Sequence, residues 1–210
     1  QAGGLLLAGV MLWDVMFRGQ LGVSVSFLEE LWARNLGQMF VSPLRPVELA
    51  AALMSVSLVR TLVGLIPAAL VAWLLYAFAI TSIGPGLIVF FLMLLAFSWA
   101  VGLAVCGLLL RYGLGAESLA WVTVFALAPI SAVYYPISIL PEWLQWVALA
   151  TPSAHVFEGM RAVMLEGRFD WGHCFWALGL NAIAMALAIW TFVSAFDAAR
   201  RDGRLLQSGE

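Results

Sequence analysis

The sequence predicts an all-α fold, a polytopic bundle of transmembrane helices, and three observations support this prediction. First, 50 consecutive residues between Arg60 and Arg111 include no Asp, Glu, Lys or Arg. A helix that crosses a bilayer needs about 20 apolar residues, so this run is long enough for two helices. Second, 64% of the residues are hydrophobic and 10% are charged, whereas soluble domains carry about 25% charged residues. Third, the mean hydropathy is +1.01. We therefore expect an integral membrane protein.

The first predicted span covers about residues 3–27 and carries charges in its second half. Charged side chains at membrane depth are expensive, so they usually face protein or a water-filled cavity. Asp14 and Arg18 are four residues apart, a spacing that suits an ion pair on one helix face. Two interpretations stay open, an internal pair or a pathway-lining role for Asp14, Arg18 and also Arg60 of the next span.

Residues 28–41 are the first stretch too polar for burial in lipid. Apolar side chains recur there every three or four residues, and polar ones occupy much of the other side. This pattern predicts a short amphipathic helix that lies at a membrane surface or against a partner, and Pro43 and Pro46 end it. The apolar set is Leu28, Leu31, Trp32, Leu36, Met39 and Phe40, and the polar set is Glu29, Glu30, Arg34, Asn35 and Gln38.

Four further spans follow along the chain. Pro46 and Glu48 suit the first turn of a helix, and the span that they begin is long enough to tilt, project beyond the bilayer or kink at Pro67. The turn sequence TSIGPG at 81–86 separates it from the next span. The span at 118–135 is barely long enough to cross the bilayer. The predicted ranges are 47–80, 86–110, 118–135 and 171–196.

Prolines break the region between about 135 and 170 into pieces too short to span. We expect two short helices, at 140–150 and 152–165. Apolar but broken segments of this kind are re-entrant or interfacial. Trp143, Trp146 and Trp171 suit the aromatic belt at the membrane surface.

The distribution of arginine predicts the orientation, since cytoplasmic loops are enriched in basic residues. All ten basic residues of the chain are Arg. With five spans, six of them fall on one side, which we expect to be cytoplasmic, together with a cytoplasmic tail at 197–210. Arg161 and Arg168 fall on the other side with the broken helices. The six are Arg34, Arg45, Arg111, Arg200, Arg201 and Arg204.

Several function classes are disfavoured by composition. The net charge of −2 argues against a nucleic-acid partner. The chain has no Lys, so it has no phosphate-binding loop of the Walker type, and any ATP hydrolysis must come from another polypeptide. Cys106 and Cys174 have no disulfide or metal-site spacing and are expected to be packing residues.

An intramembrane enzyme is a weaker alternative. A catalytic or structural metal site needs three or four converging ligands, and the chain has two His and no metalloprotease motif. We expect His155, Glu158 and Arg161 to make polar contacts at the outer membrane interface instead. No metal ligand, cofactor-binding residue or catalytic residue is therefore assigned.

Two stretches carry a resemblance to a known family. One is residues 28–48, LEELWARNLGQMFVSPLRPVE. The other begins with YPISILPEWLQW at 135–146 and continues through Thr151-Pro152 to EGMR at 158–161. With these motifs and its order of spans, the chain resembles the membrane subunits of ABC exporters of the ABC-2 type. That family has six spans per subunit, so the resemblance implies that the chain lacks the N-terminal interface helix and first span.

The resemblance implies that residues 28–41 are the coupling helix, which docks on the ATPase subunit. Glu29, Glu30, Arg34 and Asn35 would supply polar contacts, and Leu31, Trp32, Leu36 and Phe40 would anchor it. The alternative is an interfacial helix on lipid headgroups, although acidic Glu29 and Glu30 argue against binding to an anionic leaflet.

The same resemblance implies that the two short outer helices form a re-entrant external gate, although a fixed plug at the outer end of the bundle is an equal alternative. The candidate gate residues are Pro136, Leu140, Pro141, Trp143, Leu144, Pro152, Glu158 and Arg161.

These arguments together predict a permease, not an enzyme, in the cytoplasmic (inner) membrane of a bacterium. Its expected partners are two ABC ATPase subunits, membrane lipid and a second permease half, expected to be a second copy. ATP and Mg²⁺ would bind to the ATPase. The expected cargo is amphipathic, lipid-like, a glycolipid or polysaccharide, or a drug. An ion-coupled secondary transporter or channel is the alternative, but such proteins usually show more ionisable residues within spans or an internal repeat.

Overall fold

The computed structural model describes residues 2–76, 84 and 86–202, and it confirms the predicted all-α membrane bundle. Within these residues, four helices are long and apolar enough to cross a bilayer. They are α1 (Ala2–Trp32), α3 (Pro46–Tyr76), α4 (Gly86–Tyr112) and α8 (Trp171–Asp202).

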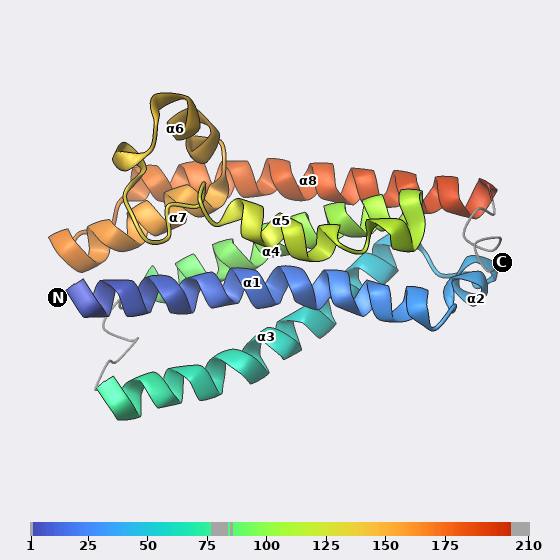
Figure 1. The fold of residues 1–210 in the computed structure, drawn as a ribbon, viewed down its shortest axis with the longest axis horizontal. Helices are drawn as coiled ribbons and strands as arrows, with labels where there is room; N and C mark the ends of the chain where they lie inside the picture. The colour runs from blue at the N-terminus through green and yellow to red at the C-terminus, as the bar shows by residue number, and fades with distance from the viewer. Residues whose placement is uncertain (1, 77–83, 85, 203–210) are drawn as a thin grey trace.

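The bundle is organised around α4, which packs along both α1 and α8 (Figure 1). Helices α4 and α8 run in the same direction, and Gly107 of α4 allows close contact with the backbone of Thr191 and Phe192. One apolar core lies toward the α2 end and includes Phe27, Leu103 and Phe192. A second core lies toward the opposite end, where α7 packs on α4 and α8.

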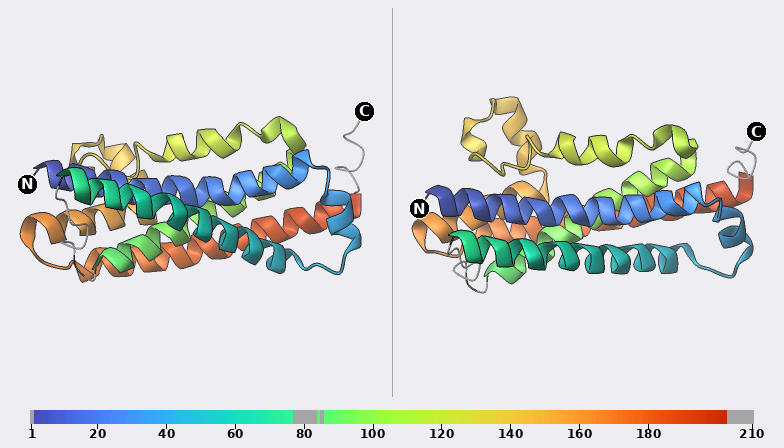
Figure 2. Two further views of the ribbon diagram at one scale, coloured as in Figure 1. Left: turned by 90° about the horizontal axis from the view of Figure 1, so that it is seen from below. Right: turned by 60° about the horizontal axis from the view of Figure 1, so that its bottom comes forward.

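Helix α3 contacts the bundle mainly through α1, along which it runs in Figure 2, and its last turns are drawn away from α1 in Figure 1. It continues through Pro67 as one helix. Most of its side chains are exposed, among them Val63, Ile66 and Leu70, so this apolar surface must face lipid or another protein. The last predicted residues of this span, 77–80, lie outside the described residues.

The predicted span at 118–135 is corrected by the structure. Its helix, α5, covers only Leu119–Leu127, and turns follow from residue 128 to 135. Nine residues of helix rise about 14 Å, roughly half of a bilayer core. Pro129 explains the early end, because it cannot donate a helical hydrogen bond and it restricts the residue before it.

The predicted single helix at 28–41 is also corrected. Helix α1 continues to Trp32, a turn covers residues 33–35, and α2 is a separate short helix over Leu36–Val41. Arg34 in this turn has a φ of 56°, a left-handed conformation that ends a helix. The apolar periodicity was continuous across the turn, so it gave no sign of the break.

The outer region contains two short helices, α6 (Glu142–Leu149) and α7 (Pro152–Arg161), and α7 continues into a π-helical turn at Ala162–Glu166. The two helices differ in burial. Nearly every residue of α7 is buried, whereas α6 buries Ala148 alone among its residues and protrudes from the bundle (Figure 1). Short 3₁₀ turns at Gly113–Ala116 and Ile137–Ile139 complete the described elements.

Candidate functional site

The loop between α1 and α3 folds back onto the chain's own core. The Phe40 ring of α2 packs edge-on against Phe196 of α8, with ring centroids 5.2 Å apart. Leu31 and Leu36 are also buried in this cluster. The structure thus places three of the expected ATPase anchors, Leu31, Leu36 and Phe40, inside the permease itself, because the turn at Arg34 rotates α2 toward α8.

The acidic residues of this loop are paired within the chain. Glu29 at the end of α1 forms an ion pair with Arg60 of α3, with 2.9 Å between Oε2 and Nη2. Glu30 accepts a hydrogen bond from Nδ2 of Asn35 at 2.9 Å. Arg60, midway along α3, is therefore paired with Glu29, whereas Asp14 and Arg18 pair with each other.

The exposed surface at the α2 end comes from other residues of the predicted coupling helix at 28–41. Trp32 is half exposed, and its Nε1 lies 3.4 Å from Oε2 of Glu117, at the turn between α4 and α5. Arg34 is exposed at the tip of the turn, and Val41 is exposed at the end of α2. Trp32 and Arg34 are the predicted residues that a docking partner could reach most directly.

Asp14 and Arg18 form the expected pair on α1, with 2.6 Å between Oδ2 and Nε. The Arg18 guanidinium also covers Gly64 of α3, where a Cβ would clash with it. The side chains keep 28% and 42% of their surface exposed, respectively. A half-exposed ion pair on the middle of a spanning helix needs cover from protein or water, because contact with lipid would be costly.

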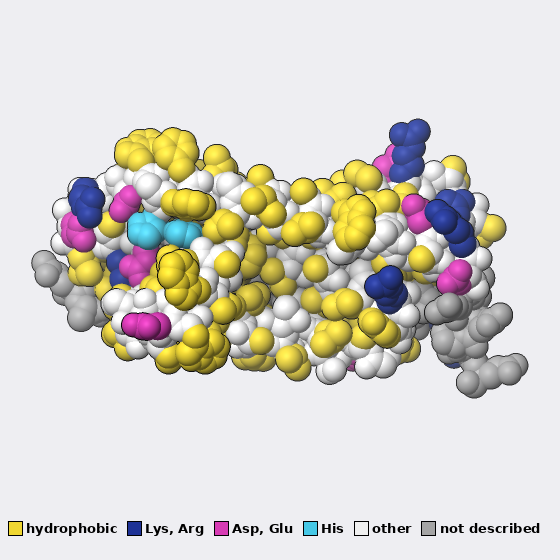
Figure 3. Space-filling model, turned by 90° about the horizontal axis from the view of Figure 1, so that it is seen from above, with side chains coloured by type: hydrophobic (Ala, Val, Ile, Leu, Met, Phe, Trp, Pro, Cys, Tyr) yellow, Lys and Arg dark blue, Asp and Glu magenta, His cyan; other side chains and the backbone are white. Residues whose placement is uncertain are grey.

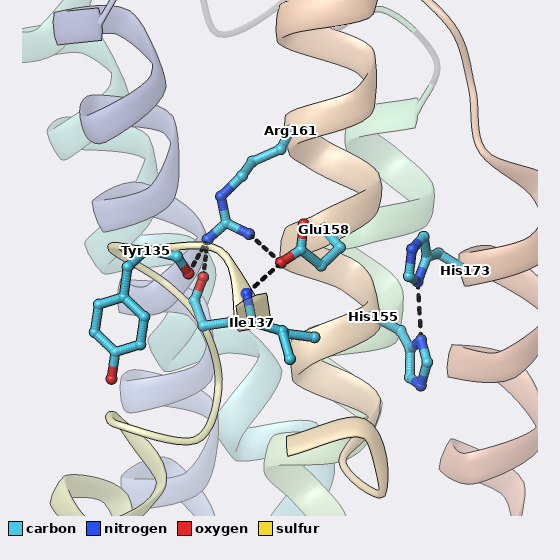
Figure 4. Close-up of polar contacts among 7 residues, drawn as sticks. Tyr135, Ile137, His155, Glu158, Arg161 and His173 are labelled. Atoms are coloured by element: carbon cyan, nitrogen blue, oxygen red, sulfur yellow. Dashed lines mark hydrogen bonds and ion pairs between the residues drawn. The ribbon is translucent and has the colours of Figure 1, made fainter. Parts of the chain in front are cut away.

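The turns after α5 are held by a buried ion pair on α7 (Figure 4). Arg161 lies 3.0 Å from Glu158, and its Nη2 donates hydrogen bonds to the carbonyls of Ala132 and Tyr135, the latter at 2.7 Å. The same Glu158 oxygen accepts the Ile137 N–H at 2.8 Å. Ala132 has a φ of 55°, and the Arg161 hydrogen bond holds this left-handed residue in place.

Glu158 and Arg161 provide hydrogen-bond partners for a stretch of backbone that is not helical. Non-helical chain at membrane depth is tolerated only where protein or water satisfies its polar groups. Arg161 and Glu158 satisfy two carbonyls and one N–H of the segment 132–137, which α5 leaves without helical partners. The polar contacts that Glu158 and Arg161 make are thus hydrogen bonds to unwound backbone of the outer region.

Two further α7 side chains hold the same region. The hydroxyls of Ser153 and Ser131 are 3.0 Å apart, and Nε2 of His155 lies 2.9 Å from the carbonyl oxygen of Leu149, the last residue of α6. On its other side, His155 meets His173 of α8 (Figure 4), with 2.9 Å between the two Nδ1 atoms. One face of α7 therefore holds the end of α5, the connecting turns and the end of α6.

The remaining candidate gate residues occupy distinct places around α6. Pro141 and Pro152 precede or begin α6 and α7, and the Leu140 carbonyl accepts a hydrogen bond from Gln145 at 2.7 Å. Trp143 is exposed. Pro136 and Leu144 are partly buried beside the loop. The structure thus brings Glu158 and Arg161 together with the backbone next to Pro136, and leaves Trp143 at the surface.

Comparison with known proteins decides the family. The family model for the ABC-2 type transporter matches residues 1–165, which include α1 to α7. This chain belongs to the ABC-2 type transporter family. A search of curated proteins found no match. The predicted resemblance is confirmed, and the chain is an integral-membrane permease component of an ABC transporter, a component that works with an ATPase subunit.

One part of the ABC-2 permease was missed by sequence reasoning, the polar contacts that join its spans. Nε1 of Trp99 in α4 donates to the Ser57 hydroxyl of α3 at 3.1 Å, and that hydroxyl donates to the Gly19 carbonyl of α1 at 2.7 Å. Gln20 of α1 donates to the Ala120 carbonyl of α5 at 3.1 Å. Small and polar residues inside apolar spans are the available signal, since such residues concentrate at helix interfaces in membranes.

Proposed function

We propose that this ABC-2 permease is the membrane subunit of an ATP-driven exporter in the cytoplasmic membrane of a bacterium. It would move an amphipathic cargo, which is lipid-like, a glycolipid or polysaccharide, or a drug. Two ATPase subunits would dock at the α2 end, and ATP and Mg²⁺ would bind to them. A second permease half, expected to be a second copy, would complete the transport path.

The braced loop between α1 and α3 is the observation that carries this proposal. The ion pair between Glu29 near the end of α1 and Arg60 midway along α3 ties the two spans together, and Phe40 fixes α2 to Phe196 of α8. A movement of the exposed turn at 33–35 would therefore be transmitted to α1, α3 and α8 together. Such rigid elements transmit movement between sites because packed interfaces shift between discrete arrangements.

Charge distribution supports a cytoplasmic α2 end. Basic side chains lie at both ends of the molecule (Figure 3), and those of the α6 end are Arg161 at the end of α7 and Arg168 between α7 and α8. The described arginines at the α2 end are Arg34, Arg45, Arg111, Arg200 and Arg201. This is the bias expected of cytoplasmic loops. The orientation places α6 and α7 on the outer side of the membrane.

The half-exposed pair of Asp14 and Arg18 supports a second half that covers α1. A charged pair on this face would be disfavoured against lipid, so the adjoining volume is expected to contain protein or the aqueous transport path. Apolar residues of α1 and α5 are also exposed and need cover as well, for example Val10, Val122 and Phe125.

The outer region supports a gate in which the two helices have different roles. Helix α7 is buried and hydrogen-bonded to the turns that it holds, which makes it the fixed part. Helix α6 protrudes and carries exposed Trp143 and Trp146, so we assign it the moving part. In this proposal α6 is the gate and α7 is the plug.

Docking can be tested at the exposed turn. Trp32→Ala and Arg34→Gly are expected to lower copurification of the ATPase and cargo-stimulated ATP hydrolysis at least tenfold while the permease still inserts. Arg34→Gly also suits a left-handed backbone, so a loss of docking would report the side chain and not the fold. Trp171→Ala is the matched control, because it removes an exposed tryptophan at the opposite end that is outside the candidate gate residues. Normal ATPase association in both loop variants would contradict the proposal.

A further inference from the structure

The contact between His155 and His173 joins the outer region to a spanning helix through two groups that can bind protons. His155 lies on α7 and His173 lies in the first turn of α8. Their Nδ1 atoms are 2.9 Å apart and the ring centroids are 5.2 Å apart. Figure 3 shows the two histidines side by side at the α6 end, where His155 is buried and His173 is partly exposed, so His173 is the ring through which protons can reach the pair.

The Leu149 carbonyl determines which atoms of this pair carry hydrogen. A carbonyl only accepts, so Nε2 of His155 must donate to it across 2.9 Å. In a neutral imidazole the other nitrogen is then an acceptor. Nδ1 of His155 therefore accepts from Nδ1–H of His173, an N–H···N hydrogen bond between α7 and α8.

The number of added protons decides whether this bond survives. With one added proton, one ring is an imidazolium that donates and the other is a neutral imidazole that accepts, so the bond is kept and is assisted by charge. With two added protons, both Nδ1 atoms carry hydrogen and both rings are cations. The acceptor is lost, and like charges face each other.

We propose that His155 and His173 form a one-proton site that latches α7 to α8, and that the latch opens when both imidazoles become charged. Opening would free the end of α6 and the first turn of α7 from α8, while Arg161 at the end of α7 continues to hold the turns after α5. The site lies outside the predicted coupling surface, and the inference does not depend on cargo or transport direction.

The surrounding groups favour the latched state near neutral pH. Burial lowers the pKa of His155 from its ordinary 6.5, although its hydrogen bond to Leu149 opposes this effect. The nearby charges are Glu158, which is paired with Arg161 on α7, and Asp170, which accepts N–H groups of Gly172 and His173 at the start of α8.

The remaining packed elements add no charge that faces the pair. Helix α6 contributes the Leu149 carbonyl, and α8 contributes the Trp176 ring stacked near His155. The described titratable residues of α4, namely Cys106, Arg111 and Tyr112, lie toward its opposite end. The proton balance of the latch is therefore set mainly by the two histidines.

The sign of the pH effect follows from linkage. A free histidine titrates near 6.5, and the latched His155 takes up a proton only at lower pH. The latched pair keeps its bond after one added proton, so the second proton is the one that the unlatched state binds more readily. The latch therefore weakens as the pH falls below 6.5 into the range where both free imidazoles would be charged. Losing one buried acceptor should speed exchange through the opened state by about tenfold.

Hydrogen exchange of the whole permease in lipid nanodiscs tests the latch. After correction for the intrinsic rate, amides of residues 142–161 should exchange about tenfold faster at pH 5.0 than at pH 6.5. His155→Gln and His173→Gln each leave one imidazole, so neither variant can reach the doubly charged state and both should lose this acid response. A response that persists in both variants would assign it to Glu158 or Asp170 and overturn the proposal, as would no response in the parent protein.

A second measurement reads the bond directly. The chain contains two His, so ¹⁵N labelling of histidine gives ring signals from these two residues alone. At pH 7.5 we expect hydrogen on Nε2 of His155, hydrogen on Nδ1 of His173, and scalar coupling between the two Nδ1 atoms. Hydrogen on Nε2 of both rings without coupling would show that the latch does not exist.

Discussion

The Ser57 hydroxyl of α3 donates a hydrogen bond to the Gly19 carbonyl of α1, across 2.7 Å and fully inside the bundle. The same hydroxyl accepts the indole N–H of Trp99 from α4 at 3.1 Å. One small polar side chain thus joins three spans at a single point. The ion pair of Glu29 with Arg60, which lies about one helical turn from Ser57, is a second link between α1 and α3.

We predict that Ser57→Ala destabilises the bundle by about 1–2 kcal/mol, because it removes one hydrogen bond and leaves the Trp99 N–H without an acceptor. Ser55→Ala is the matched control, since the exposed Ser55 hydroxyl only bonds to the Ala51 carbonyl of its own helix. Thermal unfolding in detergent should show a lower midpoint for Ser57→Ala alone. Equal midpoints would mean that the junction contributes little.

A tight approach of α1 to α3 gives a second prediction. A Cβ at Gly22 would lie 2.7 Å from the Ser57 hydroxyl and 3.0 Å from the Ser57 Cα, so it would meet backbone that cannot move aside cheaply. Gly22→Ala should therefore destabilise the bundle by about 1–3 kcal/mol. At Gly179 of α8 a Cβ meets open space, and Gly179→Ala should be neutral or stabilising. The two thermal unfolding midpoints, compared in the same detergent, check this contrast.

The sequence carried enough information for the class of fold because a long charge-free run admits few alternatives to membrane helices. It did not locate the end of α5, although Pro129 was visible, because helices in membranes often continue past proline when neighbouring groups satisfy the backbone. Pro67 in α3 illustrates that outcome. Whether a proline ends or merely occupies a helix depends on tertiary partners such as Arg161, and these cannot be read locally.

The loop at the α2 end shows a similar limit. The spacing of Leu31, Leu36 and Phe40 correctly marked an apolar face, but periodicity alone does not say what covers that face. Phe196, more than 150 residues away in the chain, covers Phe40. Arg34 was visible as a polar residue, but its left-handed backbone was not, because arginine has no particular preference for that conformation.

The brace between Glu29 and Arg60 leads to a third prediction, on coupling. Glu29→Arg and Arg60→Glu each place like charges together, and each should weaken cargo-dependent ATP hydrolysis several-fold. The double variant Glu29→Arg with Arg60→Glu restores opposite charges and should recover most of the loss. Because both side chains are about half exposed, the effect on stability should stay within about 1 kcal/mol, so coupling and unfolding can be separated.

Two other outcomes of this charge-exchange experiment would be informative about the role of Glu29. No loss in either single variant would show that the ion pair does not brace the loop. Loss in all three variants, including the exchange, would mean that Glu29 itself contacts the ATPase, as the sequence first suggested. A charge exchange of Arg168 and Glu166, which pair at the surface of the opposite end, controls for a general effect of altered charge.

Orientation can be checked chemically, as a fourth prediction. Cys substituted at Glu142 or Glu166, both exposed at the α6 end, should react with a membrane-impermeant thiol reagent on intact cells once the outer membrane is permeabilised. With the partly exposed native Cys174 replaced by Ser in every variant, Cys at Arg34 should react only after the inner membrane is opened. Substitution at the two ends reports opposite compartments in one experiment, and the reverse pattern would overturn the cytoplasmic assignment of the α2 end.

The cap formed by Arg161 leads to the last prediction. Its side chain is largely buried, and it serves Glu158 and the carbonyls of Ala132 and Tyr135 at once. Arg161→Ala should destabilise the outer region by about 3–5 kcal/mol, because it leaves a buried carboxylate and two carbonyls without a partner. Arg161→Lys keeps the charge but not the planar fork that reaches both acceptors, so it should recover only part of the loss.

Proteolysis of the whole permease provides the measurement for this prediction. Cleavage within residues 132–150 should become much faster in Arg161→Ala, intermediate in Arg161→Lys and unchanged in Arg168→Ala, whose side chain is mostly exposed. If Arg161 only neutralised Glu158, the variant that combines Glu158→Gln with Arg161→Ala would regain resistance. We expect that it does not, since the carbonyl of Ala132, in its left-handed turn, would still lack the donor that holds it at membrane depth.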